Sequence, residues 1–120
     1  MTATRFERSG RRAGLAVLAL MAGVMAEATA AEPPPPRRDA LIRMVRQDCG
    51  SCHGMQLTGG LGPALTREAL ADKSLEGLAI TIYQGRLGTP MPGWRTMLSE
   101  PEAQWIAERL AAGFPQEGSR

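Results

Sequence analysis

Three side chains capable of chemistry lie within five consecutive residues of this 120-residue sequence: Cys49, Cys52 and His53. Two thiols three positions apart on a turn of helix can each bond one of two vinyl groups on the same edge of a porphyrin. A histidine directly after the second thiol then lies beneath the macrocycle, where its neutral imidazole can bind iron. Cys-x-x-Cys-His is the signature of covalent attachment of one c-type haem. It predicts Cys49 and Cys52 as the thioether residues and His53 as the proximal iron ligand.

Other chemistry for the two cysteines is less favoured. A thioredoxin-like redox pair uses the same cysteine spacing, but it requires a βαβ context that this sequence does not have. A zinc site normally requires four ligands, and two cysteines with the single histidine provide only three of the usual donors. The remaining alternative is that the cysteines and the histidine are neighbours by chance.

An iron bound by His53 needs a second axial ligand, and the sequence contains no other histidine. Methionine is the natural alternative, since a thioether raises the reduction potential relative to harder ligands. Met91 is the favoured candidate because Pro90 and Pro92 restrict the backbone on both sides of it. A stiff loop of this kind can hold one sulfur against iron with little loss of entropy.

The other methionines beyond residue 30 are weaker candidates. Met44 precedes the attachment motif and Met55 follows His53 by two residues, so neither easily reaches the opposite face of the haem. Met97 stays an alternative ligand, although filling a gap in the core is its simpler role. An open sixth position is the third alternative, and it would favour an enzyme that binds nitrite, peroxide or a small gas.

Residues 1–30 have the features of a cleaved secretory signal peptide. Four arginines precede an uncharged apolar run over residues 13–26, which is short for a membrane span. The segment Ala28-Thr29-Ala30 fits the small-x-small rule for cleavage before Ala31. We therefore expect a periplasmic protein with no membrane segment in its mature form, and an uncleaved N-terminal anchor is the alternative.

Cleavage would leave a nearly neutral chain. The full sequence has 14 basic and 12 acidic residues, of which four arginines and two glutamates lie in 1–30, so ten of each remain. This balance argues against nucleic-acid binding, for which a basic surface is expected, and it favours apolar docking to a protein partner. A mature monomer of about 90 residues has a marginal core of its own. A covalently held haem would supplement that core.

The distribution of apolar residues and glycines predicts an all-α domain over residues 39–114. Four consecutive prolines mark 31–38 as a proline-rich arm, and Asp39 is expected to cap a helix that buries Leu41 and Val45. Glycines and Pro63 mark residues 59–63 as an irregular loop. Further helices are expected at 66–71, at 74–84 and, after a capping box that begins at Ser99, up to about residue 112, with a loop at 85–93 and a tail at 115–120.

These motifs resemble the class I cytochromes c over residues 39–114: the pentapeptide at 49–53, Gly-Gly-Leu-Gly-Pro-Ala-Leu at 59–65, and Met91-Pro92-x-Trp94 before a terminal helix. The resemblance implies a small all-α fold of three to five helices around one covalently bound haem. It implies that the Pro63 carbonyl accepts a hydrogen bond from Nδ1–H of His53, which fixes the tautomer of the histidine. It also implies that the first and last helices cross, with a packing role for Leu41, Val45, Trp105 and Ile106.

More narrowly, residues 48–55, 59–65 and 88–94 are similar to the cytochrome c-55X subfamily, small periplasmic cytochromes associated with the haem-d nitrite reductase of denitrifying bacteria. This similarity implies an outer-sphere, one-electron carrier rather than an enzyme, with that reductase as its redox partner. Two alternatives stay open. One alternative is an accessory factor in the maturation of haem d, and the other is a general electron donor to another terminal oxidoreductase.

Overall fold

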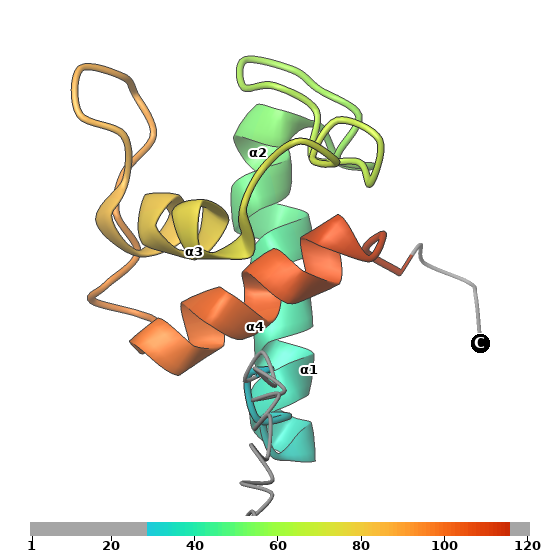
Figure 1. Ribbon diagram of the computed structural model, residues 1–120, viewed down its shortest axis with the longest axis vertical. Coiled ribbons are helices and arrows are strands. Elements are labelled where there is room, and N and C mark those ends of the chain that lie inside the picture. Colours follow the sequence, from blue (N-terminus) through green and yellow to red (C-terminus); the bar gives the residue numbers. More distant parts are fainter. Residues whose placement is uncertain (1–28, 116–120) are drawn as a thin grey trace, which may run out of the picture.

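Figure 1 shows the computed structural model, which describes residues 29–115. Over that range the chain forms helices, turns and loops and no strand, so the predicted all-α class is confirmed. The elements in chain order are α1 (Pro35–Met44), the π-helix η1 (Val45–Cys49), α2 (Gly50–His53), α3 (Leu75–Gln84) and α4 (Glu100–Ala111). Most of the predicted signal peptide at 1–30 and of the predicted tail at 115–120 lies outside the described residues. No helix within 29–115 is long and apolar enough to cross a membrane.

The elements α1, η1 and α2 follow one another without a break and form a single long helix that ends at His53. The predicted start at Asp39 is wrong, because the helix begins at Pro35 with Pro34 as its N-cap. Prolines fit the first turn of a helix, since the N–H groups there have no partner within the helix and the fixed φ of proline suits the turn. The predicted arm at 31–38 therefore overlaps the first turn of α1.

The middle of the long helix is the π-helix η1, which no feature of the sequence predicts. It begins at the buried residue Val45 and ends at Cys49. A π turn holds more residues than an α turn, so it rotates the residues after it relative to those before it. Consequently η1 sets the direction in which the attachment motif faces, relative to the core contacts of α1.

Local signals at the helix ends place α3 and α4 where the sequence predicts them. Ser74 caps α3 through its side chain, and Gly85 ends that helix with a φ of 78°. Ser99 and Glu102 form the predicted capping box of α4. The predicted helix at 66–71 is wrong, because those residues form turns. Leu70 N–H donates to the Thr66 carbonyl four residues back, but Ala71 N–H donates to the Glu68 carbonyl only three residues back. A single turn is too short to be stable as a helix, even though the Thr66 hydroxyl accepts from Ala69 N at 3.3 Å.

The core lies where α4 crosses the long helix at a steep angle (Figure 1). Leu41 and Val45 are fully buried on the long helix, and Trp105 and Ile106 of α4 are 3% and 1% exposed. All four belong to one packed cluster, so their predicted packing role is confirmed. Burial of a leucine or isoleucine side chain stabilises a fold by about 1.5–3 kcal/mol. The α3 helix packs against α4 and completes this cluster through Ala79 and other apolar residues.

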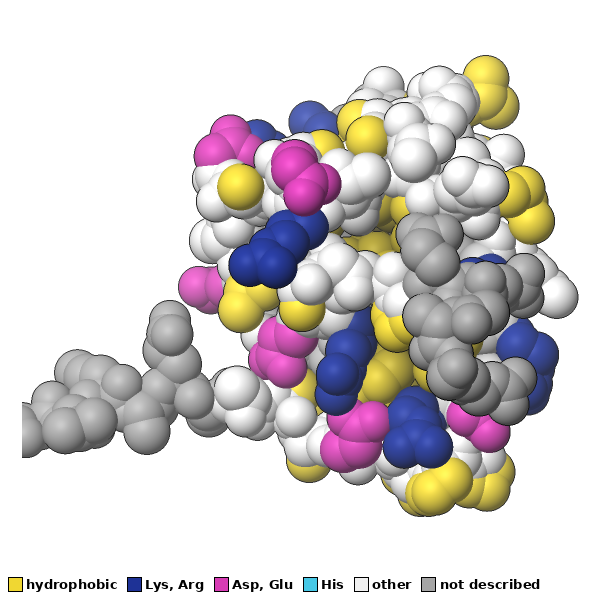
Figure 2. Space-filling view, turned by 90° about the vertical axis from the view of Figure 1, so that its right-hand side faces the viewer, with side chains coloured by type: hydrophobic (Ala, Val, Ile, Leu, Met, Phe, Trp, Pro, Cys, Tyr) yellow, Lys and Arg dark blue, Asp and Glu magenta, His cyan; other side chains and the backbone are white. Residues whose placement is uncertain are grey.

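Charges of both signs are interspersed on the surface. Figure 2 shows Lys and Arg side chains next to Asp and Glu side chains on one face, without a large patch of a single sign. Ion pairs within 29–115 include Arg37 with Glu102 and Lys73 with Asp72. This arrangement agrees with the nearly neutral charge expected of the mature chain.

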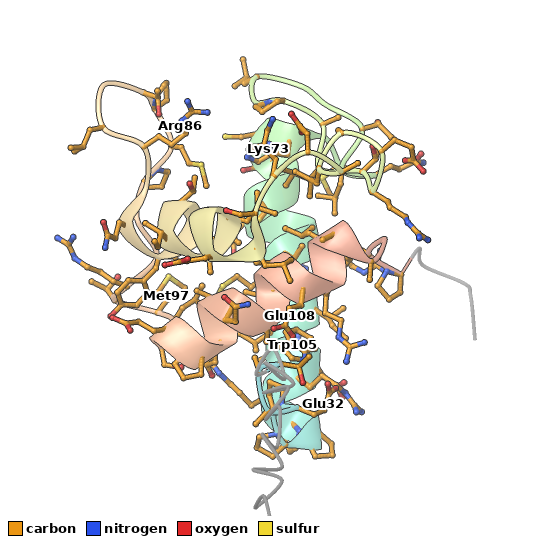
Figure 3. The ribbon with its side chains drawn as sticks, viewed as in Figure 1. Glu32, Lys73, Arg86, Met97, Trp105 and Glu108 are labelled. Carbon is orange, nitrogen blue, oxygen red and sulfur yellow. The ribbon has the colours of Figure 1, made fainter. Side chains whose placement is uncertain are left out.

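Hydrogen bonds attach the segment before α1 to α4. Figure 3 labels Glu32 of that segment and its neighbours Trp105 and Glu108 on α4. The indole N–H of Trp105 donates to Glu32 at 2.8 Å, and Arg109 donates to the same carboxylate oxygen at 2.6 Å. The Ala30 N–H donates to Glu108 at 3.0 Å. The hydrogen bond from Trp105, followed by that from Arg109, lowers the pKa of Glu32 below its ordinary value. The residues directly before the long helix are therefore fastened to the domain.

Candidate functional site

The end of the long helix carries the thiols of the attachment motif. Cys52 is exposed and Cys49 is half-buried, and both are free. Burial raises the pKa of the Cys49 thiol to about 11, and the negative charge of Asp48 adds to this effect. Since the thiolate is the nucleophile in disulfide exchange, a protonated Cys49 argues against a thioredoxin-like pair. Within residues 29–115, no three His, Cys, Asp or Glu side chains gather into a group that could hold a metal ion.

The orientation of His53 is set by one hydrogen bond. The side chain is 9% exposed, and its Nδ1 lies 2.6 Å from the carbonyl oxygen of Pro63. A carbonyl oxygen only accepts, so Nδ1 is the donor, and in the neutral imidazole the lone pair then lies on Nε2. A neutral imidazole with a free Nε2 is the form in which histidine binds metals. This is the hydrogen bond that the resemblance implies for Pro63.

The loop after α2 folds back onto the end of the helix. Gly54 leaves the helix with a φ of 88°, and the N–H groups of Gly59 and Gly62 donate to the carbonyls of His53 and Cys52, both at 2.8 Å. These bonds satisfy carbonyls that a helix end otherwise leaves without partners. A Cβ on Gly62 would lie 2.7 Å from Cε1 and 2.8 Å from Nδ1 of the histidine ring. The loop backbone therefore holds the imidazole, a role that the sequence pattern indicates only through its density of glycine.

Met91 lies half-buried in the loop between α3 and α4. Figure 1 shows this loop on one side of α2 and the loop after α2 on the other side. The base of the Met91 loop is closed, because Trp94 N–H donates to the Ile82 carbonyl at 3.1 Å and a Cβ on Gly85 would lie 2.6 Å from Gly93 N. The hydrogen bonds described over 29–115 do not connect this loop to His53. The structure thus joins His53 with Pro63 directly, and it holds Met91 on a separate, closed loop.

The predicted core role of Met97 is wrong. Figure 3 shows Met97 at the turn that precedes α4, and its side chain is 51% exposed. The next residue, Leu98, is 5% exposed and fills the core at this position instead. In this turn the Met97 N–H donates to the Trp94 carbonyl at 2.8 Å, and the side chain of Leu98 points into the core. Of the weaker ligand candidates, Met55 is 66% exposed and Met44 is half-buried on α1.

The residues at this end of the molecule fit a haem held by two thioethers. Both thiols and an oriented histidine end the same helix, as the donor set of a c-type haem requires. Large apolar side chains in the two adjoining loops are left outside the protein core: Met55 is 66% exposed, Leu61 94% and Leu87 100%. Such side chains are available for contact with an apolar macrocycle or with a partner protein.

Comparisons with known proteins agree with this chemistry. A family model described as "Cytochrome C oxidase, cbb3-type, subunit III" matches residues 37–108. The chain is 47% identical over 105 residues to cytochrome c55X of Stutzerimonas stutzeri. The aligned region covers 88% of this chain and 91% of that protein. It is similar to the solved structure of a c-type cytochrome NirC, with a TM-score of 0.65 and 51% identity over 67% of this chain and 94% of that one. It is also 35% identical over 107 residues to the dihydro-heme d1 dehydrogenase of Pseudomonas aeruginosa, but it spans only 20% of that protein.

The family model covers more than half of the chain, and the match to cytochrome c55X covers nearly the whole of that relative. The solved NirC structure bears out the predicted small, all-α class I cytochrome fold. The cofactor class that follows from this family is a c-type haem. By sequence and by structure alike, the chain belongs to the c-type cytochromes, within the cytochrome c55X family.

Proposed function

We propose that this protein is a periplasmic one-electron carrier with a single haem, attached through thioethers at Cys49 and Cys52 and bound at iron by His53 and Met91. The observation that carries the proposal is the 2.6 Å hydrogen bond between His53 Nδ1 and the Pro63 carbonyl oxygen. It leaves Nε2 free on a nearly buried histidine that directly follows two thiols. An axial histidine of a haem needs this tautomer and a fixed ring plane.

Each residue has a separate part in the proposed site. The two cysteines would hold the haem covalently at the end of the long helix. The Pro63 carbonyl keeps the proton on Nδ1 of His53 and raises the basicity of Nε2. The Met91 thioether favours the reduced state and so raises the potential. When bound, the haem supplies the iron centre that accepts and releases one electron.

A carrier is favoured over an enzyme because ligation by both His53 and Met91 would leave no position at iron for a substrate. The interspersed charges on the face in Figure 2 and the exposed apolar side chains of Met55, Leu61 and Leu87 support docking through apolar contact. Association of this kind depends only weakly on ionic strength. The export-signal pattern of residues 1–30 supports a periplasmic location, and we propose a monomeric mature form.

The proposed redox partner is the haem-d nitrite reductase of denitrification, because the chain belongs to the cytochrome c55X family and its motifs resemble cytochromes associated with that enzyme. A second candidate function is assistance in the maturation of haem d. The similarity of this chain to part of the dihydro-heme d1 dehydrogenase of P. aeruginosa favours this alternative.

Stopped-flow mixing of the reduced holoprotein with oxidised haem-d nitrite reductase tests the carrier function. We expect fast oxidation of the c-type haem, with a rate that changes little between low and moderate salt. Leu87→Asp should slow this transfer without altering the haem spectrum, since Leu87 is 100% exposed. Glu76→Ala, at an exposed position on α3, is the matched control and should leave the rate unchanged. Transfer no faster than to an unrelated oxidised cytochrome would contradict the proposed partner.

Deletion of the gene from a denitrifying host separates the two candidate functions. If the protein carries electrons, nitrite reductase purified from the deletion strain contains haem d and regains its rate when reduced holoprotein is added. If the protein acts in maturation, the purified reductase lacks haem d and added holoprotein restores nothing.

A further inference from the structure

Arg37, in the first turns of α1, reaches the start of α4 and the turn before it. Its Nε donates to Glu102 Oε1 at 2.5 Å and its Nη2 donates to Glu102 Oε2 at 3.0 Å, so the guanidinium and the carboxylate form a paired fork. The same Nη2 also donates to the carbonyl oxygen of Met97 at 2.8 Å. Paired Arg–carboxylate bonds of this type are strong and directional. The side chains are 38% and 19% exposed, so the pair lies partly out of solvent.

These bonds join two parts of the chain that no other described hydrogen bond joins. Over residues 29–115, the hydrogen bonds of Arg37 alone connect the long helix of residues 35–53 with the segment 85–102. The long helix ends in His53, and the segment begins with the loop that carries Met91. The base of that loop is otherwise bonded to the end of α3, through the Ile82 and Tyr83 carbonyls.

Glu102 is bound from both sides. One of its carboxylate oxygens, Oε2, accepts from Ser99 N at 2.8 Å as part of the capping box, and it also accepts from Arg37. The turn that contains Met97, the N-cap of α4 and the first turn of α1 therefore form one hydrogen-bonded unit. Met97, at the start of this unit, follows Met91 by six residues, and the closed loop base at Trp94 lies between them.

We propose that Arg37 is a positioning residue for the axial methionine: it fastens the segment that carries Met91 to the helix that carries His53. The inference rests on the proposed ligation by His53 and Met91. Without Arg37, the segment 95–99 stays attached to α3 and α4 but loses its hydrogen bonds to the long helix. The loop then opens more often, and an external ligand displaces the thioether more easily.

The rate at which imidazole replaces methionine in the ferric holoprotein tests the proposal, because that rate depends on how often the loop opens. Arg37→Ala should raise the rate by about tenfold, the effect of losing a charge-assisted hydrogen bond. Glu102→Gln should raise it similarly, since glutamine can keep the capping box but loses the ionic partner of Arg37. In the double variant the two effects should not add. Arg38→Ala is the matched control, because the carboxylates nearest to Arg38 lie 3.7 and 3.8 Å away.

The midpoint of urea unfolding distinguishes positioning from a general loss of stability. The proposal predicts that imidazole exchange accelerates in Arg37→Ala even in conditions where all variants stay fully folded. Rates in Arg37→Ala and Glu102→Gln that match Arg38→Ala would overturn it, whatever the unfolding midpoints. A separate variant tests the ligation on which this proposal rests. If Met91 is not the iron ligand, Met91→Ala keeps the spectrum and the imidazole exchange rate of the wild type.

Discussion

Replacement of Gly62 by alanine should displace the axial histidine. A Cβ at this position would lie 2.7 Å from Cε1, 2.8 Å from Nδ1 and 3.2 Å from Nε2 of His53. Ordinary contacts between carbon atoms are about 3.5–4.0 Å long, so the ring or the loop must move by roughly 0.7 Å or more. The ring is nearly buried and bonded to Pro63 at 2.6 Å, so either movement lengthens that hydrogen bond.

Overpacking of this kind typically costs about 1–3 kcal/mol. In a protein of this size the urea dependence of the unfolding free energy is about 1 kcal/mol per M, so the midpoint should fall by about 1 M or more. A weaker hydrogen bond also lowers the basicity of Nε2, and the reduction potential should therefore rise. Urea unfolding of the holoprotein followed by its visible spectrum measures the first effect, and a redox titration measures the second.

Gly50→Ala is the control for this experiment, since Gly50 lies in the same motif with a helical φ of −60°. A Cβ there would have its nearest neighbours in Met55, at 3.5 and 3.6 Å, which is ordinary contact. Alanine at this position should leave stability unchanged or raise it by about 0.4–1 kcal/mol. If Gly62→Ala unfolded at the same urea concentration as Gly50→Ala, the account of how the loop holds the histidine would be refuted.

Two further predictions concern the contacts of α4. Glu32→Leu should lower the urea midpoint, because the buried indole N–H of Trp105 loses its acceptor. Glu32→Gln keeps an amide oxygen at this position and should retain most of the stability. Equal losses of stability in the two variants would contradict this role of Glu32. The hydrogen bonds from Arg37 lower the pKa of Glu102 from its ordinary 4.5 to about 2. Since the folded pKa is the lower one, this contribution is present above about pH 4.5 and is lost as the pH falls toward 2. Unfolding midpoints measured across that window should fall less steeply in Glu102→Gln than in the wild type.

Helix ends with local signals could be predicted from the sequence, and those set by other means could not. Ser74, Ser99 and Gly85 act through their own side chain or backbone, so α3 and α4 are found where the sequence predicts them. The start of α1 is different, because a proline is compatible both with an extended arm and with the first turn of a helix. The π-helix η1 has no residue signature in the sequence, and only the structure reveals it.

The candidate site divides in the same way. The spacing of Cys49, Cys52 and His53 is enough to predict covalent attachment of a c-type haem. The contact between His53 and Pro63 follows from the resemblance, since no spacing rule brings a carbonyl ten residues away to an imidazole. The packing of Gly62 on the ring and the bonds of Arg37 to the start of α4 depend on contacts distant in the chain, and these become visible only in three dimensions.

The visible spectrum of the ferric holoprotein, recorded for Met91→Ala and Met97→Ala beside the wild type, is the most direct test of iron ligation by Met91. A thioether bound to ferric haem gives a red charge-transfer band, and a filled sixth position resists cyanide. We expect the band in the wild type and in Met97→Ala, and we expect its loss in Met91→Ala, which should then bind cyanide rapidly. A band that survives the loss of Met91 but vanishes without Met97 would contradict ligation by Met91.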